Sequence, residues 1–113
     1  IIMNIDISHL SKSYILNGQE ILVLNDISFR INNGDLVSLT GSSGVGKSTL
    51  LHVIGTLDTP SSGTITFDGL KVHGLSEEKI ASFRNEAIGF VFQFHHLLSE
   101  LSALENVMMP LLM

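Results

Sequence analysis

The segment at residues 41–49, GSSGVGKST, combines small residues with one lysine and several hydroxyl side chains. Its spacing matches G-x-x-x-x-G-K-[ST], with Gly41, Gly46, Lys47 and Ser48 at the defining positions. Glycine lets the backbone wrap closely around an anion, so that successive N–H groups point inward. This pattern predicts a loop that holds the phosphates of a nucleoside triphosphate.

Each polar side chain of the loop has a distinct predicted task. Lys47 reaches the β- and γ-phosphates, Ser48 offers its hydroxyl to Mg²⁺, and Thr49 donates near the α-phosphate. The predicted nucleotide-binding residues of the loop are Gly41, Ser42, Ser43, Gly44, Val45, Gly46, Lys47, Ser48 and Thr49. The loop does not select the base. The sequence contains no N-K-x-D segment of the kind that reads guanine, while a nucleotide kinase stays possible from the loop alone.

The elements beside the loop fit this prediction. Residues 36–40, LVSLT, are mostly apolar and bounded by turn residues, which favours a strand buried on both faces. Residues 47–54, KSTLLHVI, predict a helix that ends at Gly55. The amino end of that helix adds the positive end of its dipole to the phosphate site.

The remaining elements predict a sheet layer and two further helices. Alternating patterns at 4–8 and 27–31, with turns at 17–18 and 32–35, indicate antiparallel strands, and a short strand is expected at 64–69. Ser76 is a predicted N-cap for a helix over 76–86. Ser102 and Glu105 have the spacing of a capping box for a last helix. A second buried strand is predicted at 88–92, IGFVF.

Composition excludes several other classes of protein. The 113 residues suit one small domain, and the charged fraction of 15% is low. With a net charge of −5 and no run of Lys or Arg, nucleic acid is not an expected partner. The absence of cysteine excludes a disulfide scaffold and a thiolate metal site.

Together with the loop, the segments FVFQFHHLL at 90–98 and ALENVMMPLLM at 103–113 resemble the ATP-binding subunit of ABC transporters. The segments LHVIGTLDTPSSG at 51–63 and FQFHHLL at 92–98 narrow the resemblance to the ATPases of bacterial lipoprotein-releasing systems, which are kin of macrolide-exporter and cell-division ATPases. The implied fold class is α/β: a truncated P-loop NTPase fold of the ABC ATPase type, with an antiparallel β layer beside the nucleotide-binding core. Residues 1–113 correspond to the N-terminal part of one nucleotide-binding domain.

Two more residues acquire roles through this resemblance. Tyr14 falls where the family stacks an aromatic ring on adenine, although packing at the sheet edge is the alternative. Gln93 resembles the family's Q-loop glutamine, which ligates Mg²⁺ together with Ser48, helps to place the attacking water and senses the transmembrane partner. The alternative for Gln93 is an exposed polar residue at the end of a strand.

Two further groups of residues invite interpretation. His95 and His96 are adjacent and lack a third ligand at metal spacing, so we expect them on a surface that faces a membrane-embedded partner rather than in a metal site. Val107, Met108, Met109, Leu111 and Leu112 surround Pro110. Core packing and contact with a partner both remain open for this apolar group.

The family's signature L-S-G-G-Q, its apolar strand ending in Asp-Glu and its later histidine do not occur in this sequence. The resemblance therefore implies Mg-ATP binding here and a catalytic glutamate outside these residues. The implied whole protein is a peripheral ATPase on the cytoplasmic face of the inner membrane. Its implied partners are a second copy and transmembrane permease subunits. The other classes are a soluble P-loop kinase or GTPase, and a non-catalytic nucleotide-binding or interaction module.

Overall fold

The computed structural model describes residues 3–42, 44, 46–94 and 96–112. Two long strands, β1 (Ile5–Leu16) and β2 (Gln19–Ile31), form an antiparallel hairpin. Asn17 and Gly18 connect them with φ of 53° and 74°, as a tight turn between twisted strands requires. The hairpin predicted from this dipeptide is therefore confirmed.

The sheet has a further strand on the other edge of β1. Strand β3 (Ser62–Phe67) runs antiparallel to β1, with Ile5 opposite Phe67 and Ile7 opposite Ile65. The short β4 (Leu70–Lys71) follows, which gives the order β2-β1-β3-β4. The predicted antiparallel layer is confirmed, and the strand expected at 64–69 begins and ends two residues earlier.

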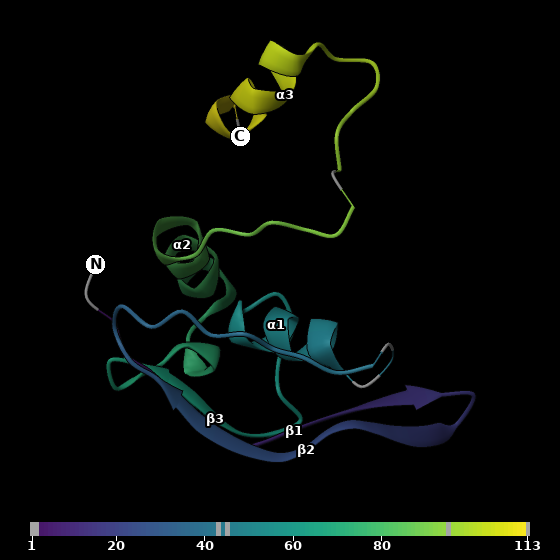
Figure 1. Cartoon of the computed structure of the whole chain (residues 1–113), viewed down its shortest axis with the longest axis vertical. Coiled ribbons are helices and arrows are strands. Elements are labelled where there is room, and N and C mark those ends of the chain that lie inside the picture. The colour runs from purple at the N-terminus through teal and green to yellow at the C-terminus, as the bar shows by residue number, and fades with distance from the viewer. Residues whose placement is uncertain (1–2, 43, 45, 95, 113) are drawn as a thin grey trace.

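Helix α1 (Lys47–Ile54) lies over one face of this sheet (Figure 1). Leu50 and Val53 on its inner side are buried against apolar side chains of the strands. The buried core consists of Ile7, Leu10, Leu24, Leu50, Val53, Ile65, Phe67 and Val72. The helix ends as predicted at Gly55, whose N–H donates to the Leu51 carbonyl at 2.8 Å.

After β4 the chain forms a short 3₁₀ turn, η1 (Val72–Gly74), and then helix α2 (Glu77–Ala87). The hydroxyl of Ser76 accepts a hydrogen bond from the Lys79 N–H at 3.4 Å, so the predicted N-cap is confirmed. Phe83 packs edge-on against Phe67, with the ring centroids 4.9 Å apart. This contact attaches α2 to the edge of the core.

The two buried strands predicted at 36–40 and 88–92 are wrong for this chain. Neither segment belongs to the sheet that the described residues form. Leu36 and Val91 are fully exposed, although the apolar pattern predicted burial. A strand buried on both faces needs neighbours on its two edges, and the described chain supplies none for these segments.

The last helix, α3 (Ala103–Met108), continues into a 3₁₀ turn, η2 (Met109–Leu112), and stands apart from the sheet and the other helices (Figure 1). The predicted capping box is present: Ser102 and Glu105 exchange hydrogen bonds of 3.0 and 3.1 Å. Val107 and Leu111 are exposed, so core packing within the described chain does not account for them.

A search of the described residues finds no helix with the length and apolar character that a membrane span needs.

Candidate functional site

The glycine loop enters α1 through a left-handed residue. Gly46, the N-cap of the helix, has φ of 98°, and its carbonyl accepts the Leu50 N–H at 2.9 Å. A Cβ on Gly46 would lie 3.1 Å from Cγ1 of Val23 and 3.2 Å from the Val23 carbonyl oxygen. Glycine is therefore required twice, for backbone conformation and for close approach to β2. Ser43 and Val45 lie outside the described residues.

The ammonium of Lys47 turns back over the loop. It donates hydrogen bonds to the carbonyl oxygens of Gly41 and Ser42, the latter at 2.8 Å. Among the described residues, no ion pair involves Lys47. Its charge is therefore held at the loop by neutral carbonyls, which leaves it free to be neutralised by an anion.

A cavity of about 390 Å³ opens at the amino end of α1. Its lining brings together glycine backbone, one ammonium, two hydroxyls and one carboxamide from distant parts of the chain. The lining residues are Val23, Gly44, Gly46, Lys47, Ser48, Thr49 and Gln93. Six of the predicted site residues thus share one cavity, which combines donors for an anion with oxygen ligands of the kind that Mg²⁺ takes.

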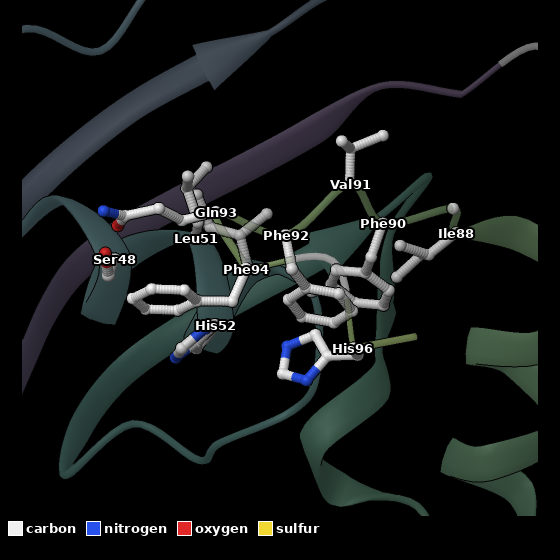
Figure 2. Close-up of a pocket in the computed structure, with 13 residues that line it drawn as sticks. Ser48, Leu51, His52, Ile88, Phe90, Val91, Phe92, Gln93, Phe94 and His96 are labelled. Carbon is white, nitrogen blue, oxygen red and sulfur yellow. The ribbon is translucent and has the colours of Figure 1, made fainter. Parts of the chain in front are cut away.

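Gln93 reaches this place from the extended segment after α2. Figure 2 shows its amide end on the same side as the hydroxyl of Ser48. Ser48 and Gln93 also line a second cavity of about 590 Å³, which adjoins the first. Gln93 thus lies beside Ser48, the other predicted Mg²⁺ ligand, although it follows an extended segment rather than a strand.

The second cavity is walled by aromatic rings. The rings of Phe90 and Phe92 stack with centroids 5.5 Å apart, and His96 meets Phe92 edge-on at 4.9 Å. Figure 2 shows Val91 pointing away from these rings, as alternation in an extended backbone requires. His96 is exposed, and His95 lies outside the described residues.

Tyr14 lies on β1, outside the lining of the loop cavity. Its hydroxyl donates to Oδ2 of Asp58 at 2.7 Å, and the Lys12 ammonium lies 4.9 Å from the ring centroid. The hydrogen bond to Asp58 raises the pKa of Tyr14, with burial and the negative charge of Asp58 adding to it, while the Thr49 hydroxyl acts in the opposite direction. Tyr14 as a whole residue is 40% exposed.

Asp58, the hydrogen-bond partner of Tyr14, was not predicted from the sequence. Its partial burial pushes its pKa up, but hydrogen bonds from Tyr14, Lys12 and the Thr59 N–H outweigh this and lower the pKa overall. Only a turn was visible in the segment DTPSSG. The contact between positions 14 and 58 spans 44 residues and has no local sequence signal.

The strand layer, the glycine loop and the helix that it opens define the P-loop class of nucleoside triphosphatase folds. The profile of the ABC transporter family matches residues 24–110, and the chain belongs to this family.

Individual relatives agree with the profile. The lipoprotein-releasing system ATP-binding protein LolD of Bordetella pertussis is 53% identical over 104 residues, which cover 92% of this chain and 45% of that protein. LolD of Geobacter metallireducens is 52% identical over 108 residues, 96% of this chain and 48% of that protein. The chain thus spans about half the length of the curated relatives it matches.

Solved structures extend the likeness to three dimensions. The dimeric structure of MJ0796, described as a bacterial ABC transporter cassette, matches with a TM-score of 0.87 and 39% identity, covering 96% of this chain and 47% of that one. A post-hydrolysis state of the same cassette, bound to ADP and Pi, matches with a TM-score of 0.87 and 38% identity. The predicted fold class and the family resemblance are confirmed.

Proposed function

We propose that this chain binds the triphosphate of ATP, with Mg²⁺, at the cavity where α1 begins. The observation that supports this most strongly is the convergence of Lys47, Ser48 and Gln93 on one cavity. An ammonium that only carbonyl oxygens hold among the described residues is suited to an incoming anion. The donor set therefore fits a magnesium–triphosphate unit.

Each residue of the site has its own proposed role in binding Mg-ATP. Backbone N–H groups of residues 41–49 and the amino end of α1 hold phosphate oxygens. Lys47 supplies a mobile positive charge, and the side-chain oxygens of Ser48 and Gln93 are the protein ligands for Mg²⁺. When bound, Mg²⁺ neutralises charge on the phosphates. Tyr14 provides an exposed ring on which the adenine base stacks.

We further propose that residues 1–113 form the N-terminal part of one nucleotide-binding domain. The unpaired segments 36–40 and 88–92 support this, because they expose Leu36, Val37, Leu39, Val91 and Phe92, as expected if neighbouring strands were supplied by other residues. The sequence contains no L-S-G-G-Q and no apolar strand ending in Asp-Glu. The chain alone is therefore expected to bind Mg-ATP weakly and not to hydrolyse it.

In the complete protein, ATP hydrolysis powers a membrane transporter, and lipoprotein release is the favoured process. The names of the LolD relatives support this choice, and a macrolide-type exporter or cell-division complex is the alternative. The dimeric form of the MJ0796 cassette supports a second copy as partner. The other proposed partners are transmembrane permease subunits, and the proposed location of the complete protein is the cytoplasmic face of the inner membrane.

To test this proposal, the chain is titrated with Mg-ATP and with inorganic tripolyphosphate. Binding is measured by calorimetry and by the shift in Tm. Replacing Lys47 by Ala removes one charge-assisted interaction, so both ligands should bind about tenfold to a hundredfold more weakly. Lys79→Ala, which removes an exposed lysine on α2, is the matched control and should bind like the wild type. Equal binding by Lys47→Ala and the wild type would reject the proposed site.

A further inference from the structure

We propose that Asp58 is a positioning residue that fixes the ring of Tyr14 as the platform for the nucleotide base. The inference rests on the proposed function, because it requires the triphosphate to lie at the glycine loop. It adds a determinant of base binding that lies neither in the loop nor on the strand that carries Tyr14.

The carboxylate of Asp58 is held at both oxygens. Oδ2 accepts the Tyr14 hydroxyl at 2.7 Å, while Oδ1 accepts the Lys12 ammonium at 3.1 Å and the Thr59 N–H at 2.8 Å. Lys12 also donates to the Thr59 carbonyl at 2.7 Å. The side chains of Lys12 and Tyr14 therefore clamp the turn after α1 to β1.

The clamp determines where the Tyr14 ring lies. Lys12 and Tyr14 are two positions apart on β1, so their side chains leave the same face of the sheet. The Lys12 ammonium lies over the ring at 4.9 Å from its centroid, so one face of the ring is occupied by a cation. Tyr14 remains 40% exposed as a residue, so its side chain is accessible to a base.

Tyr14 is also close to the loop. The hydroxyl of Thr49, in the first turn of α1, acts against Asp58 on the pKa of the Tyr14 phenol, which it lowers. A base joined through ribose to phosphates at the loop therefore meets a ring that is already oriented. Without the hydrogen bond to Asp58, the ring would lose rotational freedom only when the base binds. This entropy cost would weaken the binding of the base but not that of the phosphates.

The sequence provides a direct readout of this arrangement. Tyr14 is the single tyrosine and the chain has no tryptophan. Phenolate absorbance and tyrosine fluorescence therefore report on one side chain. Removing the Asp58 charge should lower the Tyr14 pKa and change its fluorescence. Because burial also raises this pKa, Asp58→Asn, which keeps the size of the side chain, separates the loss of charge from a loss of packing near the turn.

The experiment compares Asp58→Asn and Asp58→Ala with the wild-type chain, using ATP and inorganic tripolyphosphate as probes with Mg²⁺. Both variants should bind ATP about threefold to tenfold more weakly and tripolyphosphate unchanged, with a lowered Tyr14 pKa. Asp26→Asn is the control for loss of a carboxylate, because Asp26 is likewise bonded to a β1 side chain, the Nδ1 of His9 at 2.8 Å. It should change neither affinity.

Tyr14→Phe keeps the ring but cannot donate to Asp58, so it should reproduce the loss for ATP. Adding Asp58→Ala to it should weaken ATP binding no further. Equal losses for ATP and tripolyphosphate, or full ATP affinity in Tyr14→Phe, would overturn the positioning role alone. A wild-type chain that binds neither ligand would overturn the proposed function, and the stacking role with it.

Discussion

The Cα of Gly55 lies directly against the ring of Phe90. A Cβ built on this glycine would be 2.5 Å from Cε1 of Phe90 and 3.0 Å from the Leu51 carbonyl oxygen. Gly55, at the end of α1, thus leaves room for the Phe90 ring of the segment that carries Gln93. Because Phe90 and Gln93 are only three positions apart, this contact helps to place Gln93.

Gly55→Ala should therefore disturb the segment rather than the helix. The φ of Gly55 is −76°, so alanine meets no backbone strain, but its methyl group must displace the Phe90 ring. We expect a loss of about 1 to 2 kcal/mol in the free energy of unfolding, as for other overpacked sites. Urea unfolding measures it, and changed NMR shifts of the Phe90 and Phe92 rings would locate it.

Gly89→Ala is the matched control, because a Cβ there would meet nothing within 4 Å. Its stability should stay within about 0.5 kcal/mol of the wild type. Equal stability of Gly55→Ala and Gly89→Ala would contradict the close contact with Phe90.

Alanine substitutions at the two loop glycines, Gly44 and Gly46, distinguish the cost of backbone strain from the cost of steric contact. Gly44 and Gly46 both have positive φ, 81° and 98°, but only a Cβ on Gly46 approaches β2, at 3.1 Å from Cγ1 of Val23. Gly44→Ala should cost about 1 kcal/mol through strain alone. Gly46→Ala should cost about 2 to 3 kcal/mol, since strain and contact add. Thermal unfolding of both variants tests the order, and a larger loss for Gly44→Ala would contradict it.

Local patterns in the sequence were sufficient wherever the structure depends on neighbouring residues. The hairpin at Asn17 and Gly18, the N-cap at Ser76 and the capping box at Ser102 all follow from side chains within a few positions of one another. The glycine loop was predictable for the same reason. Its spacing alone brings an ammonium and two hydroxyls to the start of a helix.

The errors and omissions concern contacts between distant segments. Residues 36–40 and 88–92 have the composition of buried strands, but burial depends on neighbours that the described chain does not provide. The bond between Tyr14 and Asp58 was missed because the two residues come together only after β1 and the turn following α1 have packed. An apolar composition allows a segment to be buried, but whether it is buried depends on the strands that pair with it.

Val91 offers a test of the proposed domain organisation. Its side chain is fully exposed in the chain, so Val91→Asp should change the free energy of unfolding by no more than about 0.5 kcal/mol. In a longer protein whose further residues cover the segment, the same substitution would bury a carboxylate and cost about 3 kcal/mol or more.

The comparison therefore needs urea unfolding of Val91→Asp in both the 113-residue chain and a longer protein that contains it. Ser99→Asp, at another exposed position of the same connection, controls for added charge. A similar small effect of Val91→Asp in both proteins would contradict the proposal that other strands pack on residues 88–92.

The bond between Tyr14 and Asp58 also predicts how stability depends on pH. The pKa of Asp58 lies below its ordinary value of 3.8, so its ionised form stabilises the folded chain above that pH, and this contribution disappears as the pH falls further. The pKa of Tyr14 lies above its ordinary value of 10.0. The protonated phenol therefore stabilises the fold up to that pH, and its contribution is lost as the pH rises beyond it.

Urea unfolding at acid, neutral and alkaline pH checks both directions. Relative to the wild type, Asp58→Asn should be less stable at neutral pH, and the difference should shrink below the ordinary carboxyl pKa of 3.8. Tyr14→Phe should likewise approach the wild type above pH 10.0, where the phenol of the wild type ionises. A stability difference that stays constant from acid to alkaline pH would mean that the bond between these two side chains contributes nothing to the fold.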